Sequence, residues 1–147
     1  MGMYVYGCDI CQNVCPRNRA WISQELPVNR RVAGRAKNFE ITALLHMDRD
    51  YFTSKVWPHM FYMSPDDLWK WKMNVARVMG NSLDERYIPE LVRAFAENSD
   101  GRVRGMIAWS IGRIGGTKAG KLLEGFLKKD NEGMVGEEIS SALNSIS

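Results

Sequence analysis

The sequence predicts an all-α fold, an α-solenoid of stacked helix pairs that follows a short cysteine segment. Three observations support this prediction. The 147 residues are 45% hydrophobic, which is enough for one globular core. From residue 64 onward the chain repeats itself after about 32 residues, as helical repeat proteins do. The three cysteines, Cys8, Cys11 and Cys15, lie close together near the start, where they predict a metal or cluster site.

Composition excludes several classes of protein. No window approaches the roughly 18 consecutive apolar residues of a membrane span, and the first ten residues do not resemble a secretory signal. The net charge of +3 is too small to indicate nucleic-acid binding by itself. An odd, tightly clustered set of cysteines is a poor disulfide framework and indicates a reducing compartment. We therefore expect a cytoplasmic protein.

The chain divides into two predicted parts. Residues 1–38 form the second half of an iron–sulfur cluster-binding segment and an irregular linker, in which Pro27 and Gly34 argue against a long helix. Residues 39–147 form the helical repeat domain. This domain is expected to begin with two short helices over 39–63.

Capping signals locate the helices at the start of the repeat domain. Asp48 is the expected N-cap of the second short helix, which the Trp57-Pro58 step should end. Ser64 and Pro65 predict the start of a longer helix, with a capping hydroxyl and a proline at the first helical position. This helix is expected to stop at Gly80, since glycine often follows a helix.

Similar residues recur at a spacing of 32 positions, as from Ala76 to Ala108 and from Gly80 to Gly112. Each unit reads as a helix, a glycine-containing turn and a second helix, which resembles a HEAT-like repeat of slightly reduced length. Two full units and a final half-unit fit. The alternative, a helical bundle with coincidental spacing, is less favoured because apolar positions match in all three units. The expected core is Ala76, Met79, Leu91, Ile107, Ile111, Leu123, Ile139 and Leu143.

The cysteine spacing matches a ferredoxin-type motif. The bacterial run is C-x2-C-x2-C-x3-C-P, and Cys8, Cys11, Cys15 and the following proline reproduce all but its first cysteine, where the chain has Val5. In two-cluster proteins the cysteine before the proline ligates the other cluster. We therefore expect Cys8 and Cys11 to ligate one 4Fe-4S cluster and Cys15 a second. Two clusters need eight thiolates, so the missing ligands should lie N-terminal to this segment.

Two other interpretations of the cysteines remain open. Cys8 and Cys11 form a good zinc half-site that His46 or His59 would extend, although no second C-x2-C or H-x3-H follows. Each histidine by itself is more often a surface or packed side chain. A thioredoxin-like C-x2-C is the third interpretation, but no βαβ pattern surrounds it.

The stretch YGCDICQNVCPRNR, residues 6–19, resembles the second cluster motif of the epoxyqueuosine reductase family. Residues 73–81 and 103–115 resemble two helices of that family's C-terminal repeats. The resemblance implies a HEAT-like C-terminal region, two 4Fe-4S clusters, dependence on cobalamin and a relationship to reductive dehalogenases. Two differences stand out: Arg17 replaces a tryptophan usual after the Cys-Pro step, and residues 26–38 are only loosely similar.

The resemblance implies the C-terminal fragment of an iron–sulfur oxidoreductase that acts in tRNA queuosine modification. The expected partners are the missing N-terminal domain, which would hold the catalytic and cobalamin-binding residues, and tRNA. Four basic residues are candidate RNA contacts, although interspersed acids also fit a solvated helix face: Lys72, Arg77, Arg104 and Arg113. The alternative function is a helical-repeat scaffold for a protein partner, with a structural metal site and no redox role.

Overall fold

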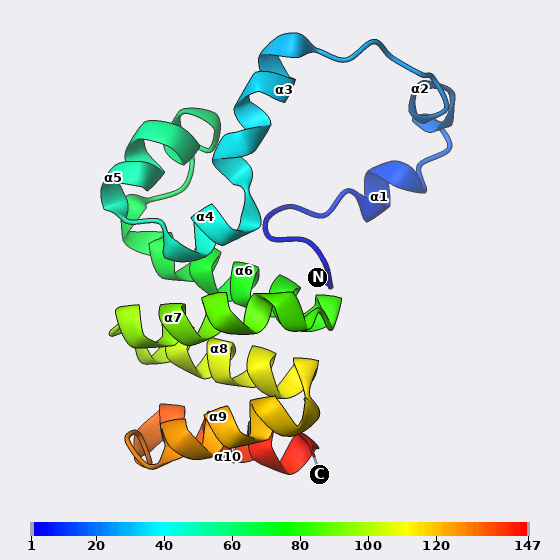
Figure 1. Cartoon of the computed structure of the whole chain (residues 1–147). Helices are drawn as coiled ribbons and strands as arrows, with labels where there is room; N and C mark the ends of the chain where they lie inside the picture. Colours follow the sequence, from blue (N-terminus) through cyan, green and yellow to red (C-terminus); the bar gives the residue numbers. More distant parts are fainter. Residues whose placement is uncertain (1, 147) are drawn as a thin grey trace.

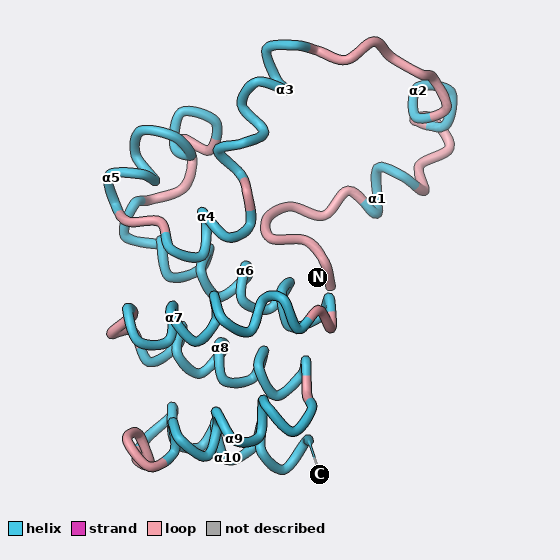
Figure 2. Tube along the Cα trace, viewed as in Figure 1, coloured by secondary structure: helices cyan, strands magenta, loops and turns pink. Residues whose placement is uncertain are grey.

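The computed structural model describes residues 2–146, and within that range all regular structure is helical (Figures 1 and 2). The all-α prediction is confirmed. The part before residue 68 is built of short elements. They are α1 (Ile10–Asn13), α2 (Arg19–Ile22), α3 (Arg30–Ala36), η1 (Lys37–Phe39), α4 (Ile41–His46), α5 (Arg49–Tyr51), η2 (Phe52–Val56), η3 (Trp57–His59) and η4 (Pro65–Asp67).

The second half of the chain is a stack of longer helices. They are α6 (Leu68–Ser82), η5 (Glu85–Tyr87), α7 (Ile88–Glu97), α8 (Gly101–Ile114), α9 (Gly116–Leu127) and α10 (Gly133–Ile146). Helix α8 packs between α6 and α10, while α7 and α9 form the second layer (Figure 1). The helices of the first layer begin 33 and 32 residues apart, at 68, 101 and 133. The repeat, with two full units and a final half-unit, is confirmed.

One continuous core runs through the stack. Seven of the eight residues expected in it are buried, and Ile111 has no exposed surface. The exception is Leu143, which is half-buried and packs against the core from α10. Leu44 and Phe52 join the same core, so the short helices before residue 64 cap the first repeat. Because the expected positions are inward-facing in every unit, the register of the repeat is the predicted one.

Capping residues act where the sequence predicted them, but two element ends differ. The Asp48 side chain accepts a hydrogen bond from the backbone N–H of Tyr51, and the Ser64 hydroxyl accepts one from Asp66. The chain after Tyr51 does not stop at the Trp57-Pro58 step. It continues as one π-helical turn and then a 3-10 turn, because proline fits at the start of a new turn where no intrahelical N–H is needed.

Gly80 does not end its helix. Helix α6 continues to Ser82, and Leu83 provides the left-handed C-cap with φ of 56°. The role of Gly80 is close packing, since a Cβ there would lie 2.8 Å from the Cα of Ser110. The contact recurs one repeat later, where a Cβ on Gly112 would lie 2.8 Å from the Cβ of Ala142. Both glycines let first-layer helices approach closely.

Adding one methyl group at this contact should destabilise the domain. We expect Gly112→Ala to cost about 1–3 kcal/mol, because the new Cβ forces α8 and α10 apart. Gly125→Ala is the matched control on α9, where a Cβ meets nothing within 4 Å. This change should be stabilising by up to about 1 kcal/mol, through the better helix propensity of alanine. Urea unfolding followed by circular dichroism measures both, and effects of the same sign would contradict the packing role.

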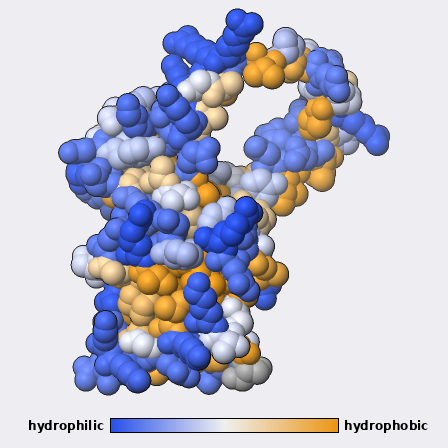
Figure 3. All heavy atoms as spheres, viewed as in Figure 1, coloured by the Kyte–Doolittle hydropathy of each residue, from blue (hydrophilic) through white to orange (hydrophobic). Residues whose placement is uncertain are grey.

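An extended arm precedes the stack. Residues 7–36 leave the repeat domain and return to it at α4 (Figure 1). None of the residues in α1, α2 and α3 is buried. Apolar side chains are exposed along the arm (Figure 3): Ile10, Val14, Trp21, Ile22, Leu26, Val28 and Val32. The arm therefore contributes no core of its own, and it carries the three cysteines.

Candidate functional site: the cysteine segment and the first-layer face

The three cysteines lie at the beginning of the arm. Cys8 and Cys11 are exposed, Cys15 is half-buried, and all three are free thiols. Cys11 is in the single turn of α1, and the other two flank it. The Asn18 side-chain amide donates to the Gln12 side-chain oxygen at 2.6 Å and to the Gln12 carbonyl at 3.2 Å. These bonds close the loop that holds Cys15.

The donor set fits an iron–sulfur cluster in kind but not in number. Thiolates are the usual cluster ligands, and a 4Fe-4S cluster takes four of them. In the part of the chain that the structure describes, no three His, Cys, Asp or Glu side chains come together where they would hold a metal ion. The position of the missing first cysteine is used for packing, because Val5 is half-buried against the core. Any cluster on these thiols needs ligands from outside this segment.

The two histidines have partners other than the cysteines. His46 lies between two carboxylates, with Nδ1 2.6 Å from Glu97 and Nε2 3.0 Å from Glu90. The hydrogen bond from His46 is the main reason that the pKa of Glu97 is lowered. His59 lies 3.5 Å from a guanidinium nitrogen of Arg35. His46 thus ties α4 to α7, and neither contact resembles a zinc site.

Reconstitution of the 147-residue chain should not yield a stoichiometric 4Fe-4S cluster. Three thiolates that serve two clusters complete neither of them. Iron and sulfide analysis after anaerobic reconstitution measures this directly, with visible spectra as a second readout. A tetrahedral zinc bound to Cys8, Cys11 and Cys15 in the purified chain would instead support the zinc interpretation.

Two of the four candidate RNA contacts are engaged inside the domain. The Lys72 ammonium donates to the Asn98 side chain at 3.1 Å, and burial is the main reason that its pKa is lowered. Arg104 binds Asp130 through two nitrogens, one at 3.0 Å, and its guanidinium stacks on Phe95. Both pairs span 26 residues and are related by the 32-residue shift. The repeat pattern in the sequence could therefore have revealed this shared structural contact.

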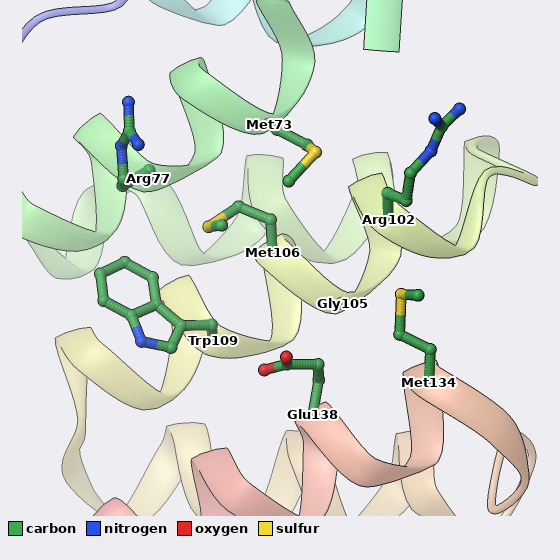
Figure 4. A pocket seen from close by; sticks show the side chains of 8 residues that line it. All are labelled: Met73, Arg77, Arg102, Gly105, Met106, Trp109, Met134 and Glu138. Carbon is green, nitrogen blue, oxygen red and sulfur yellow. The ribbon is translucent and has the colours of Figure 1, made fainter. Parts of the chain in front are cut away.

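The other two candidates lie on the face formed by α6, α8 and α10. Arg77 lines an apolar hollow of about 260 Å³, together with three methionines and Trp109 (Figure 4). Arg113 is exposed and lines a neighbouring, more polar hollow that also includes Asn81 and Trp109. Trp109, which lies between the two, was not singled out from the sequence. It occupies the position of Arg77 one repeat later, so the 32-residue shift could have drawn attention to it.

These observations define a helical-repeat protein with a cysteine-bearing arm, and the chain belongs to the HEAT-repeat family, whose model matches residues 62–144. Its curated relatives include the epoxyqueuosine reductase of Bacillus cereus, 26% identical over 147 residues that cover 97% of this chain and 37% of that enzyme. An uncharacterized protein encoded in the gldA 3' region of Geobacillus stearothermophilus is 30% identical, covering 95% of this chain and 63% of that protein.

Solved structures agree with this assignment. The epoxyqueuosine reductase of Bacillus subtilis superposes with a TM-score of 0.74 at 25% identity, covering 99% of this chain and 38% of that one. An epoxyqueuosine reductase bound to an epoxyqueuosine-modified tRNA stem loop shares the fold, with a TM-score of 0.70 at 23% identity. The resemblance to this family is confirmed, and the chain corresponds to a C-terminal portion of its members. It spans about 37% of the length of the curated epoxyqueuosine reductases it matches.

Within residues 2–146, no helix has the length and apolar character that crossing a membrane requires.

Proposed function

We propose that this chain is the C-terminal part of an epoxyqueuosine reductase, which acts in the cytoplasm on tRNA in queuosine modification. The observation that carries the proposal is the end-to-end match. Similarity to the Bacillus cereus enzyme covers 97% of the chain, so it includes both the cysteine arm and the repeats. A scaffold that shared only the repeat fold would need to match only the repeats.

We further propose that the division of the chain falls near residue 38. Residues 1–38 would complete an iron–sulfur segment, and 39–147 would form the repeat domain. In the whole protein Cys8 and Cys11 would ligate one 4Fe-4S cluster, and Cys15 the other. Such clusters supply electrons one at a time. Cobalamin would be held by the part of the enzyme that this chain does not span, and no residue here is assigned to it.

RNA contact is proposed for the face formed by α6, α8 and α10. Arg77 and Arg113 lie there beside Trp109, a combination of cations and an aromatic ring that suits phosphates and bases (Figure 4). Lys72 and Arg104 are already paired with Asn98 and Asp130. Their contribution to RNA binding is therefore expected to be smaller than that of the first two.

Alanine substitutions should separate these two classes of basic residue. Arg113→Ala should weaken binding of a tRNA stem loop and reduce the slope of log K against log salt by about 1, since one phosphate contact is lost. Arg104→Ala should leave affinity nearly unchanged and lower stability by about 1–3 kcal/mol, because Asp130 loses its partner. Fluorescence anisotropy at several salt concentrations and thermal unfolding measure the two effects. Equal loss of affinity in two folded variants would contradict the assignment.

Complementation tests the proposed function. The full-length protein is expressed in a bacterial strain that lacks its own epoxyqueuosine reductase, and tRNA nucleosides are analysed by mass spectrometry. We expect queuosine to be restored. Persistent epoxyqueuosine with a well-expressed protein would overturn the proposal. Purification of that protein with stoichiometric zinc and no iron would favour the scaffold alternative.

A further inference from the structure

The cysteine segment is attached to the repeat domain by a stack of aromatic side chains. Tyr6, two residues before Cys8, lies on Trp71 of α6 with ring centroids 5.4 Å apart and planes within 13°. Tyr62 contacts the same tyrosine ring at 5.9 Å. Aromatic pairs of this kind contribute about 0.5–1.5 kcal/mol beyond the apolar area they bury.

Trp71 is itself fixed by the core. Only 3% of it is exposed, and its indole N–H donates to the sulfur of Met63 at 3.0 Å. Its ring also meets the fully buried Phe52 edge-on, at 6.4 Å between centroids. The surface that Tyr6 contacts is therefore a rigid part of the domain, and it belongs to the first helix of the repeat stack.

Two further contacts hold the same short segment. Val5 packs against the core, and the Asn81 side-chain amide donates to the Gly2 carbonyl at 2.9 Å. Asn81 also lines the hollow that contains Trp109 and Arg113. The residues before the cysteines are thus attached beside the face proposed for RNA.

The attachment ends directly before the cysteines. Gly7 adopts φ of 72°, in the left-handed region that favours glycine, and the chain turns away from the domain there. Nothing lies within 4 Å of a Cβ built on Gly7, so this turn is not required by crowding. Tyr6 is consequently the last side chain anchored to the repeats before Cys8.

We propose that Tyr6 and Trp71 form a joint that fixes where the segment Cys8–Cys15 lies relative to the repeat domain. Both are positioning residues, since neither is expected to touch RNA or a cluster. The role of this joint in catalysis rests on the proposed function: it would keep a tRNA held on the repeats at a set separation from the thiols. The joint itself is a property of this chain and is testable without RNA or iron.

A distance measurement in the 147-residue chain tests the joint. In a Cys11→Ser, Cys15→Ser background, spin labels are placed on Cys8 and on an introduced cysteine, Lys121→Cys, at an exposed position of α9. Tyr6→Ala should make the distance distribution at least about twofold wider, because the stacking energy is lost. Tyr6→Phe should keep the original width, since stacking needs no hydroxyl. Tyr4→Ala is the matched control, with 40% exposure against 41% for Tyr6, and should change nothing.

The outcomes separate the joint from global stability and from the proposed function. The thermal midpoint of the repeats should be the same in Tyr6→Ala and wild type, and an unchanged distance distribution in this variant would overturn the joint. In the full-length enzyme Tyr6→Ala should lower kcat several-fold while the Kd for tRNA stays unchanged, and Tyr6→Phe should restore kcat. A widened distribution in a protein that does not reduce epoxyqueuosine would refute the proposed function and leave the joint standing.

Discussion

Replacing Ile111 with aspartate is expected to unfold the repeat domain. Ile111 lies in the middle helix of the first layer with no exposed surface. A carboxylate at this position would be buried without a partner, and the apolar contacts of the isoleucine would be lost. The combined cost should exceed about 4 kcal/mol, a large share of the roughly 5–15 kcal/mol that stabilises a typical domain.

Circular dichroism during thermal and urea unfolding measures this loss. Met134→Asp is the matched control, since Met134 is 58% exposed and lies in the first turn of α10. An acid near a helix N-terminus is favourable, so this variant should stay within about 0.5 kcal/mol of wild type. A cooperative transition at the wild-type midpoint for Ile111→Asp would be incompatible with the packing described above.

Replacing either Cys8 or Cys15 with serine is expected to abolish turnover in the full-length enzyme. A serine hydroxyl is a much poorer cluster ligand than a thiolate, and even outer-shell changes at metal sites cost about 10–100-fold. The loss of activity should therefore be at least about 100-fold. The two substitutions should differ in spectra, because the cysteine before the proline is expected to serve the second cluster.

Electron paramagnetic resonance and iron content distinguish the two variants. Cys8→Ser should perturb the signal of one cluster, and Cys15→Ser the signal of the other, while the thermal unfolding of the repeats remains unchanged. Asn13→Ser, an exposed change within the same loop, provides the control and should retain activity. Loss of the same cluster in both cysteine variants would refute the division of ligands, and full activity in either would refute their role in electron transfer.

The arrangement of the stack was predictable from the sequence because its causes are local or periodic. Ser64 and Asp48 cap their turns through side chains that reach only two or three residues along the chain. Inward-facing positions such as Ile107 and Ile111 repeat at a fixed spacing, since each unit buries the same side of its first helix. The cysteine spacing alone likewise indicated the ferredoxin-type motif and its family.

Glycine and lysine positions show where the sequence is ambiguous. Gly80 read as a helix end, yet in the structure it lies within α6 against Ser110. Both roles use the absence of a Cβ, and only the position of a helix 30 residues away distinguishes them. Lys72 likewise resembled Arg113 as a basic helical residue, until the fold placed Asn98 beside its ammonium group.

The sequence by itself thus determined the helices, the repeat and the kind of ligand that the cysteines offer. Only the tertiary structure decided which basic residues remain available on the α6, α8 and α10 face, and that Tyr6 is anchored on Trp71. The physical reason is the range of the interactions. Capping and periodic burial act within one helix or one repeat, whereas pairing, stacking and close approach depend on residues that folding alone brings together.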